Sequence, residues 1–244
     1  MYLVFMAESG DGGLNTANAE FPVYGQAAVV VLDREYAART DRQLRQFKRS
    51  ALGSEEARLN PRDIAKQRGP FALLNVPEQR RRFSQQLSDL LASLPLILIA
   101  ACLNKHMHQR EYGPFGRAAC TFTLPFIQER LVYLLASRHD GAAVVAQAHG
   151  RREDAEFRAV WADQLAHGSY YHSPSEFSSR LSKLDLRPAR QNVSGLQLAG
   201  LAANACARFV LDPENPNAVF AALSAKLYQG TFSEPDRFGL KVIP

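Results

Sequence analysis

Residues 94–105 read LPLILIAACLNK and contain the longest apolar run of the chain, and this run decides the fold class. The unbroken apolar stretch at 96–103 predicts a strand that is covered on both faces, because a strand with one solvated face alternates apolar and polar side chains. The run is too short for a membrane-spanning helix, which needs about 20 apolar residues. Strands of this kind belong to layered α/β proteins, so we expect a sheet with helices on its faces.

Further strands are predicted on either side of this run. The first ten residues, rich in Val, Leu, Phe and Tyr, predict a strand that ends at the Gly-rich turn 10–13. The segment YGQAAVVVLD (24–33) predicts a second strand, antiparallel to the first. GAAVVAQA (141–148) predicts another core strand, and SKLDLRP (182–188) predicts an edge strand that ends at Pro188.

Helical periodicity fills the segments between these strands. Residues 34–94 predict a helical insertion after the second strand, and helices are also predicted at 121–137, from Arg151 onward, and at 194–210. A chain of 244 residues can bury a substantial core, so we expect a single domain over 1–244 with its helical insertion at about 34–94.

Composition narrows the class of protein. The net charge of +5 is compatible with an anionic partner such as nucleic acid without requiring one. The three cysteines are widely separated and odd in number, which favours buried thiols over a disulfide or a metal site. The N-terminus lacks the basic segment and cleavage site of an export signal, so we expect a cytoplasmic protein without a membrane partner.

Six segments, taken in order, resemble those of a known family. They are AESGDGG after the first strand (7–13), RDIAKQRGPFALL (62–74), a central strand that ends in NK (104–105), ERLVYLL (129–135), AHGRRED (148–154) and GLQLAGLAA (195–203). Their order and spacing, over almost the whole chain, resemble the bacterial domain-of-unknown-function family 3800. Members have a ribonuclease-H-like fold and usually begin with a strand that runs into Asp-Glu-Ser-Gly-Asp. The resemblance therefore implies a ribonuclease-H-like mixed sheet flanked by helices.

The resemblance also implies a nuclease-like site, in which carboxylates converge on divalent metal. Two such cations about 4 Å apart need several anionic oxygens to hold them. This sequence departs from the family pattern at each acidic position, because the three acids match Ala7, Gln147 and Gly200. We therefore expect no cofactor, with Mg²⁺ or Mn²⁺ needed only if the protein is active.

The third of these positions lies on a polar stripe of the last predicted helix. Gln197, Gly200, Asn204 and Arg208 recur at i, i+3, i+7 and i+11, which places them on one helix face. Glycine inside a helix is less stable than alanine by about 0.5–1 kcal/mol. A glycine at this position is therefore locally unfavourable, and a vacated ligand position would account for it.

Three acids remain as candidates for a residual metal site. Asp11 belongs either to such a site or to the Asp-Gly turn. Glu153 and Asp154 either serve it or stabilise the start of a helix, where the helix dipole favours anions. Glu8 cannot take over from Ala7, because neighbouring residues of a strand point to opposite faces.

Several cationic and polar residues are candidates for nucleic-acid contact. Lys105 ends the central strand where the family tends to place a lysine, and it serves either as a phosphate contact or as a surface lysine. His149 either contacts phosphate or caps its strand. Arg151 and Arg152 adjoin the predicted site and favour contact with backbone phosphates. Gln197 and Arg208, on the polar stripe, complete the set.

The leading hypothesis is a catalytically depleted, ribonuclease-H-like protein of a nuclease family. It would serve as a nucleic-acid-binding or scaffold subunit in a bacterial or mobile-element complex, with defence as one setting. The first alternative is an active metal-dependent nuclease, seen with introduced substitutions at its acids or using Asp11, Glu153 and Asp154. The second alternative is a protein-interaction module, and the sequence does not distinguish DNA from RNA as the partner.

Overall fold

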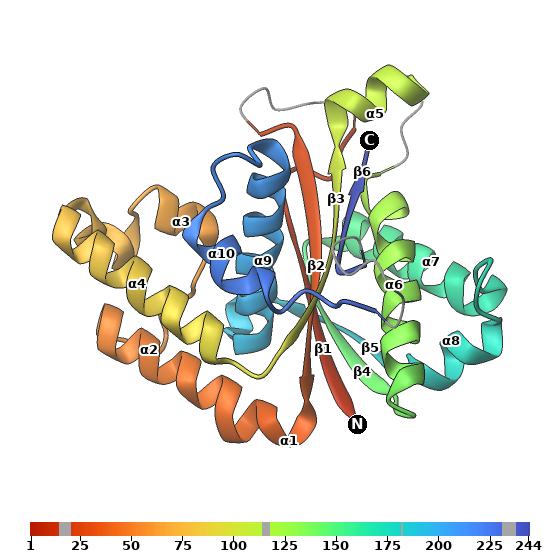
Figure 1. Ribbon diagram of the computed structural model, residues 1–244, viewed down its shortest axis with the longest axis horizontal. Coiled ribbons are helices and arrows are strands. Elements are labelled where there is room, and N and C mark those ends of the chain that lie inside the picture. The colour runs from red at the N-terminus through yellow and green to blue at the C-terminus, as the bar shows by residue number, and fades with distance from the viewer. Residues whose placement is uncertain (15–20, 114–117, 182, 231–237) are drawn as a thin grey trace.

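One mixed β-sheet lies at the centre of the molecule (Figure 1). The computed structural model describes residues 1–14, 21–113, 118–181, 183–230 and 238–244. Within these ranges six strands pair in the order β5-β4-β1-β2-β3-β6. They are β1 (Tyr2–Ser9), β2 (Val23–Leu32), β3 (Ile97–Asn104), β4 (Ala142–Ala148), β5 (Lys183–Pro188) and β6 (Leu240–Ile243). Among them only β2 runs antiparallel to its neighbours, and the other adjacent pairs are parallel.

The strands predicted from the sequence are confirmed. The apolar run at 96–103 forms β3, whose residues are buried except at its two ends. The first two strands form the predicted antiparallel pair. The edge position of β5 and its end at Pro188 are also as predicted, although Ser182 lies outside the described residues. The short strand β6, which extends the sheet beyond β3, was not predicted.

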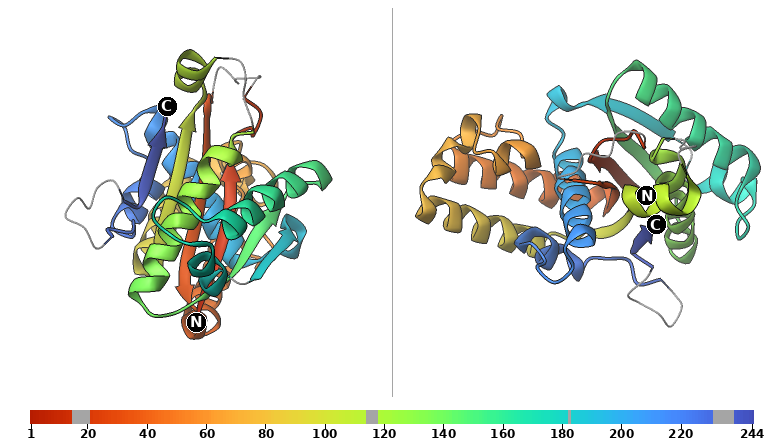
Figure 2. Two further views of the ribbon diagram at one scale, coloured as in Figure 1. Left: turned by 90° about the vertical axis from the view of Figure 1, so that its right-hand side faces the viewer. Right: turned by 90° about the horizontal axis from the view of Figure 1, so that it is seen from above.

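Helices cover both faces of the sheet (Figures 1 and 2). On one face lie α9 (Ser194–Leu211) and α10 (Ala218–Ser224), and on the other lie α6 (Cys120–Ser137), α7 (Arg151–His167) and α8 (Pro174–Arg180). The short helix α5 (Lys105–Tyr112) continues directly from β3, and a 3₁₀ turn, η3 (Ala189–Gln191), precedes α9. The predicted helices at 121–137, from Arg151 and at 194–210 are therefore confirmed as α6, α7 and α9.

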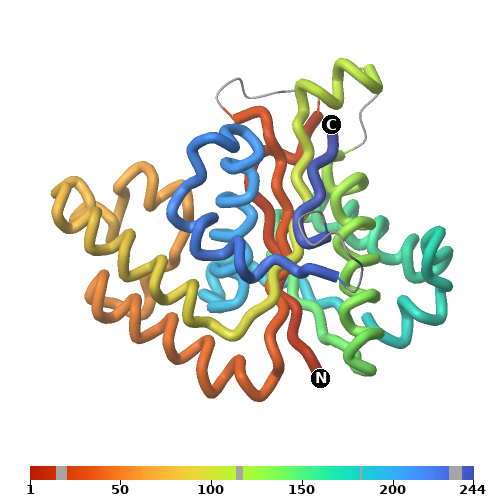
Figure 3. Tube along the Cα trace, in the orientation of Figure 1, coloured from red at the N-terminus to blue at the C-terminus, as the bar shows by residue number. Residues whose placement is uncertain are grey.

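The segment between β2 and β3 is helical, as predicted, and extends to one side of the sheet (Figure 3). It consists of α1 (Asp33–Glu35), the π-helical turn η1 (Tyr36–Asp41), α2 (Arg42–Leu52), α3 (Pro61–Ala65), the 3₁₀ segment η2 (Gly69–Asn75) and α4 (Pro77–Ser93). The ring of Phe83 packs against Phe47 at 5.5 Å and against Phe71 at 6.0 Å. These contacts join α2, η2 and α4, and we call the whole segment 33–94 the helical arm.

The core is divided by the sheet into two layers, because side chains alternate along each strand. Phe5 and Ala7 of β1 face α9 and the helical arm, whereas Val4 and Met6 face α6 and α7. All three cysteines are free and buried, which confirms the predicted buried thiols. Over the described ranges, no helix has both the length and the apolar character needed to cross a membrane.

Helix α9 packs unusually close to the sheet because small residues line its contact face. A Cβ added to Gly195 would lie 2.2 Å from Cγ of Phe5, and one added to Gly25 of β2 would lie 2.6 Å from the carbonyl oxygen of Ala203. Both separations are far below van der Waals contact. Glycine at these two positions therefore allows the helix to lie directly over β1 and β2.

Candidate functional site

A polar groove opens where β1 and β4 end. The two strands are parallel neighbours in a register that pairs Met6 with Ala146, so their carboxyl ends meet at the same edge of the sheet. The groove has a volume of about 650 Å³ and runs between these strand ends, α3 and α9. At its floor, Nδ2 of Asn204 donates a hydrogen bond to Oγ of Ser9 at 2.9 Å, which ties α9 to the end of β1.

The three positions that match the family's acids lie together beside this groove. Ala7 and Gln147 follow the paired residues Met6 and Ala146, so they are side by side and face α9. A Cβ added to Gly200 would lie 4.0 Å from the Cβ of Ala7. Gln147 and Gly200 line the groove, and Ala7 is 2% exposed beneath it. Residues of β1, of β4 and of α9, at positions 7, 147 and 200 of the sequence, thus converge on one point.

The glycine at position 200 differs from the glycines that α9 needs for packing. At Gly195 an added Cβ would collide with Phe5, but at Gly200 the nearest side-chain atom among the described residues is the Cβ of Ala7, at an ordinary contact distance of 4.0 Å. Space for a side chain therefore exists at position 200, and packing gives no reason for glycine there.

The side chains at the three matched positions, the methyl group of Ala7, the amide of Gln147 and the single hydrogen of Gly200, do not form a site for divalent metal. Hard cations such as Mg²⁺ bind anionic and carbonyl oxygens, and positions 7 and 200 offer no side-chain oxygen at all. Over the described part of the chain, no group of three or more His, Cys, Asp and Glu side chains is arranged to hold a metal ion. The residues at the three matched positions therefore do not fit the metal that the resemblance implies.

A second cavity, of about 550 Å³, adjoins the groove at the ends of β1 and β4 and extends toward α6 and α7, and Glu8, Asp11 and Gln147 line both cavities. Glu8 points into it, as the alternation along β1 predicts, and accepts a hydrogen bond from Nε2 of Gln26 at 3.2 Å. Nε2 of His149 lies 3.8 Å from the second carboxylate oxygen of Glu8. Burial raises the pKa of Glu8, and the neighbouring His149 opposes the shift. Tyr24 also lines this cavity, and the burial of its hydroxyl raises its pKa well above the usual value.

The three residual acids also line the second cavity, but each has a local partner. Oδ1 of Asp11 accepts a hydrogen bond from the backbone N–H of Gly13 at 3.1 Å, the geometry of the predicted Asp-Gly turn. Oδ1 of Asp154 accepts a hydrogen bond from the backbone N–H of His149 at 2.8 Å, at the start of α7. Glu153 is exposed and lies 3.8 Å from Nε of Arg152.

The predicted nucleic-acid contacts fall into separate places. Lys105 is fully buried at the start of α5, with Nζ 3.6 Å from Asp11, and burial lowers its pKa. It is therefore not a surface lysine. Arg151 and Arg152 are exposed at the start of α7, and Arg152 lines the second cavity together with His149.

The predicted polar stripe of α9 is confirmed, because Gln197, Gly200, Asn204 and Arg208 all line the groove. The side-chain amide of Gln197, however, already holds the segment at Leu59 against the start of α9. Its Oε1 accepts a hydrogen bond from the backbone N–H of Leu59 at 2.9 Å, and its Nε2 donates to Asn192. Arg208 remains exposed, with its guanidinium over the ring of Phe21 at 5.5 Å.

Three basic residues of the groove were not singled out from the sequence. Arg58, Arg62 and Lys66, at and around α3, form the wall opposite α9. Only Arg62 lies within α3, whereas Arg58 precedes the helix and Lys66 caps its C-terminal end, so helical periodicity gave no signal for the three together. Their distance from the matched acidic positions along the chain hid their place in the site.

Comparisons with protein-family models, with curated proteins and with solved structures find no match to this chain.

Proposed function

We propose that this protein is a ribonuclease-H-like member of a nuclease family whose metal-binding carboxylates have been replaced, and that it binds nucleic acid without efficient cleavage. One observation carries the proposal: Ala7, Gln147 and Gly200 lie together at the meeting point of β1, β4 and α9. Each position matches an acid of the family that the sequence resembles. We place the protein in a bacterial or mobile-element complex, as a recognition or scaffold subunit.

The topology supports the ribonuclease-H-like part of the proposal. The sheet is mixed, with only β2 running against its neighbours in the described ranges, and helices cover both faces. The acid positions of the family lie on a first strand, on a later strand and in the last long helix, and these three elements meet at one groove here. Residues that converge from three elements define a site better than residues that are close in sequence.

The charge at the three positions supports loss of metal-assisted cleavage. Metal ions held by carboxylates activate water and stabilise the leaving oxygen of a phosphodiester. Without those carboxylates the repulsion between two divalent cations is not offset. What the site retains is a polar groove in which exposed cationic side chains outnumber the two lining carboxylates, Glu8 and Asp11, and such a groove can hold a phosphodiester backbone.

The test restores the acids. The triple variant Ala7→Asp, Gln147→Glu, Gly200→Asp is compared with the unaltered protein for cleavage of labelled single- and double-stranded DNA and RNA, with Mg²⁺ or Mn²⁺. The matched control is Ala7→Asn, Gly200→Asn, which adds side chains of the same shape without charge. We expect cleavage only by the restored variant, and circular dichroism shows whether each variant is folded. Metal-dependent cleavage by the unaltered protein would overturn the proposal.

An active nuclease is the second candidate, and one observation favours it: Asp11, Glu153 and Asp154 line the second cavity together with Glu8. This candidate predicts that the unaltered protein cleaves nucleic acid and that Glu153→Gln, Asp154→Asn abolishes the cleavage. A pure protein-interaction module is the remaining alternative. It predicts no nucleic-acid binding, whereas binding through phosphate neutralisation weakens steeply as salt is raised.

A further inference from the structure

The positive charge of this protein is concentrated in the helical arm. Residues 33–94 contain 13 Arg and Lys and 8 Asp and Glu, an excess of five that equals the net charge of the whole chain. The remainder of the chain is therefore neutral in sum. A polyanion that approaches the molecule is attracted to the arm more than to the sheet or to α6–α8.

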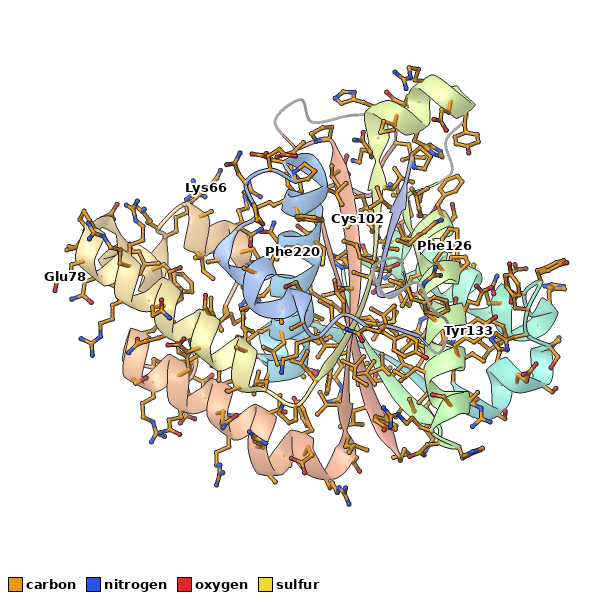
Figure 4. All side chains as sticks on the ribbon, in the orientation of Figure 1. Lys66, Glu78, Cys102, Phe126, Tyr133 and Phe220 are labelled. Carbon is orange, nitrogen blue, oxygen red and sulfur yellow. The ribbon has the colours of Figure 1, made fainter. Side chains whose placement is uncertain are left out.

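Within the arm, three basic side chains are turned toward the groove. Arg58, Arg62 and Lys66 are exposed and line the wall opposite α9. Figure 4 shows Lys66 on the side of the arm nearest α9, far from Glu78 at the outer end of α4. Within the described ranges none of the three side chains forms an ion pair, whereas Arg45 and Arg49 pair with Glu55. Their charge is therefore available to a ligand in the groove. The two carboxylates that line it, Glu8 and Asp11, lie at the end of β1, where they accept hydrogen bonds from Gln26 and from the backbone N–H of Gly13.

This wall is held rigidly against α9. The backbone N–H of Leu59 donates to Gln197, and Nδ2 of Asn192 donates to the carbonyl oxygen of Glu55 at 3.2 Å. Oδ1 of Asn60 accepts from the backbone N–H groups of Arg62 and Asp63, which starts α3 at a defined point. The basic side chains therefore extend from a preformed segment, which lowers the entropy lost when they bind.

A planar stacking surface lies on the α9 side of the same groove. The guanidinium of Arg208 lies over the ring of Phe21, and Nε donates to Oδ1 of Asn204 at 3.3 Å, which fixes the plane. Both Phe21 and Arg208 line the groove. Unpaired bases stack on arginine planes and aromatic rings, whereas the bases of a duplex are already stacked on each other.

The size of the groove also favours an unpaired strand. Its volume of about 650 Å³ lies within the range of about 300–1,000 Å³ that is typical of small-ligand pockets. A DNA duplex, whose major groove alone is about 12 Å wide, would rest on the rim rather than enter. Phosphates of a single strand can enter and reach both walls.

From these observations we propose that the groove between α3 and α9 holds a single strand of nucleic acid, with its phosphates against Arg58, Arg62 and Lys66 and a base on the plane of Arg208. The inference rests on the proposed nucleic-acid-binding function and assigns its substrate class and its path. The strand would cross the groove directly above the three matched acidic positions, where Gln147 and Gly200 line the same surface.

The experiment measures binding of fluorescein-labelled oligo(dT) and oligo(U), and of a labelled duplex, by fluorescence anisotropy over a range of salt concentrations. The groove variant is Arg58→Gln, Arg62→Gln, Lys66→Gln. The control variant, Arg42→Gln, Arg81→Gln, Arg82→Gln, removes the same charge from exposed positions of the arm that do not line the groove. Arg208→Lys keeps the charge but removes the stacking plane.

We expect the unaltered protein to bind single strands more tightly than the duplex. The groove variant should bind about tenfold more weakly or worse, and the slope of log affinity against log salt should fall in magnitude by about 2, since each phosphate contact of a single strand contributes about 0.7. The control variant should change both quantities much less. Arg208→Lys should weaken binding and leave the slope unchanged.

Two outcomes would overturn the inference while leaving the proposed function intact. Equal weakening by the groove and control variants would mean that binding follows net charge and not the groove. Tighter binding of the duplex would exclude the single strand as the preferred ligand. Absence of binding to every probe would overturn both the inference and the nucleic-acid part of the proposed function.

Discussion

Gly200 of α9 lies directly over Ala7 of β1, such that a Cβ added to the glycine would be in van der Waals contact with the alanine Cβ at 4.0 Å. Helix and strand meet here through two of the smallest residues, beside a polar groove. The space above Ala7 is wide enough for a side chain at position 200. This relationship leads to a prediction about stability that is independent of function.

Gly200→Ala should stabilise the protein by about 0.5–1 kcal/mol, because alanine loses less backbone entropy in a helix and its Cβ has room. Gly195→Ala, five residues earlier in the same helix, is the matched control. It should destabilise the protein by about 1–3 kcal/mol, because its Cβ would overlap the ring of Phe5. Urea unfolding measures both. Destabilisation by Gly200→Ala would show that packing, after all, requires glycine at position 200.

Gln197→Ala should destabilise the protein by about 1–3 kcal/mol. The substitution leaves the backbone N–H of Leu59 without its acceptor at a buried position. Hydrogen exchange gives a local readout, since protection should be lost at Leu59 and its neighbours before other regions. Asn204→Ala, on the same stripe of α9, removes a different bond, to Ser9, and should leave protection at Leu59 unchanged.

Glu8 should make stability depend on pH. Burial raises the pKa of Glu8 above its ordinary value of 4.5 in the folded protein, so the folded state binds a proton more tightly than the unfolded chain does. The contribution is therefore fully present below the unfolded pKa and is lost as pH rises through the folded pKa. We expect Glu8→Gln to remove this fall in the free energy of unfolding, as measured by urea titrations from pH 4 upward.

His149 provides the control for this prediction. The imidazole of His149, 3.8 Å from the carboxylate of Glu8, opposes the rise in the pKa of Glu8, so His149→Gln should shift the fall in stability to higher pH. An unchanged pH profile in both variants would mean that Glu8 is solvated in the folded protein.

The three thiols should be inert in the folded protein. Burial raises the pKa of Cys120 and of Cys206 to about 12 and that of Cys102 well above its usual value. Because the thiolate is the reactive form, reaction with Ellman's reagent at pH 8 should be slow in buffer and complete in denaturant. Rapid labelling of any one thiol under native conditions would contradict the buried placement.

The extent to which the sequence predicts this structure can be seen in particular elements. The apolar run of β3 and the alternating face of β1 were sufficient to predict a covered sheet, since neighbouring residues carry the periodicity of a strand. The short elements α5 and β6 were missed, because a few residues carry no clear period and their partners lie elsewhere in the chain.

At the site, the alternation along β1 correctly placed Glu8 on the face opposite Ala7. The position of Lys105 at a strand end did not distinguish surface from core, and the structure shows that this lysine is buried.

The sequence by itself determined the kinds of element, the polar stripe on α9 and the absence of acids at positions 7, 147 and 200, because these are properties of residues close together in the chain. Tertiary structure alone decided that Arg58, Arg62 and Lys66 face that stripe, and that Gln197 holds their segment in place across 138 positions of sequence. The physical reason is that a groove is formed between elements. Its walls are set by how α3 packs against α9 over the ends of β1 and β4, and that packing depends on the summed contacts of the core rather than on any local pattern.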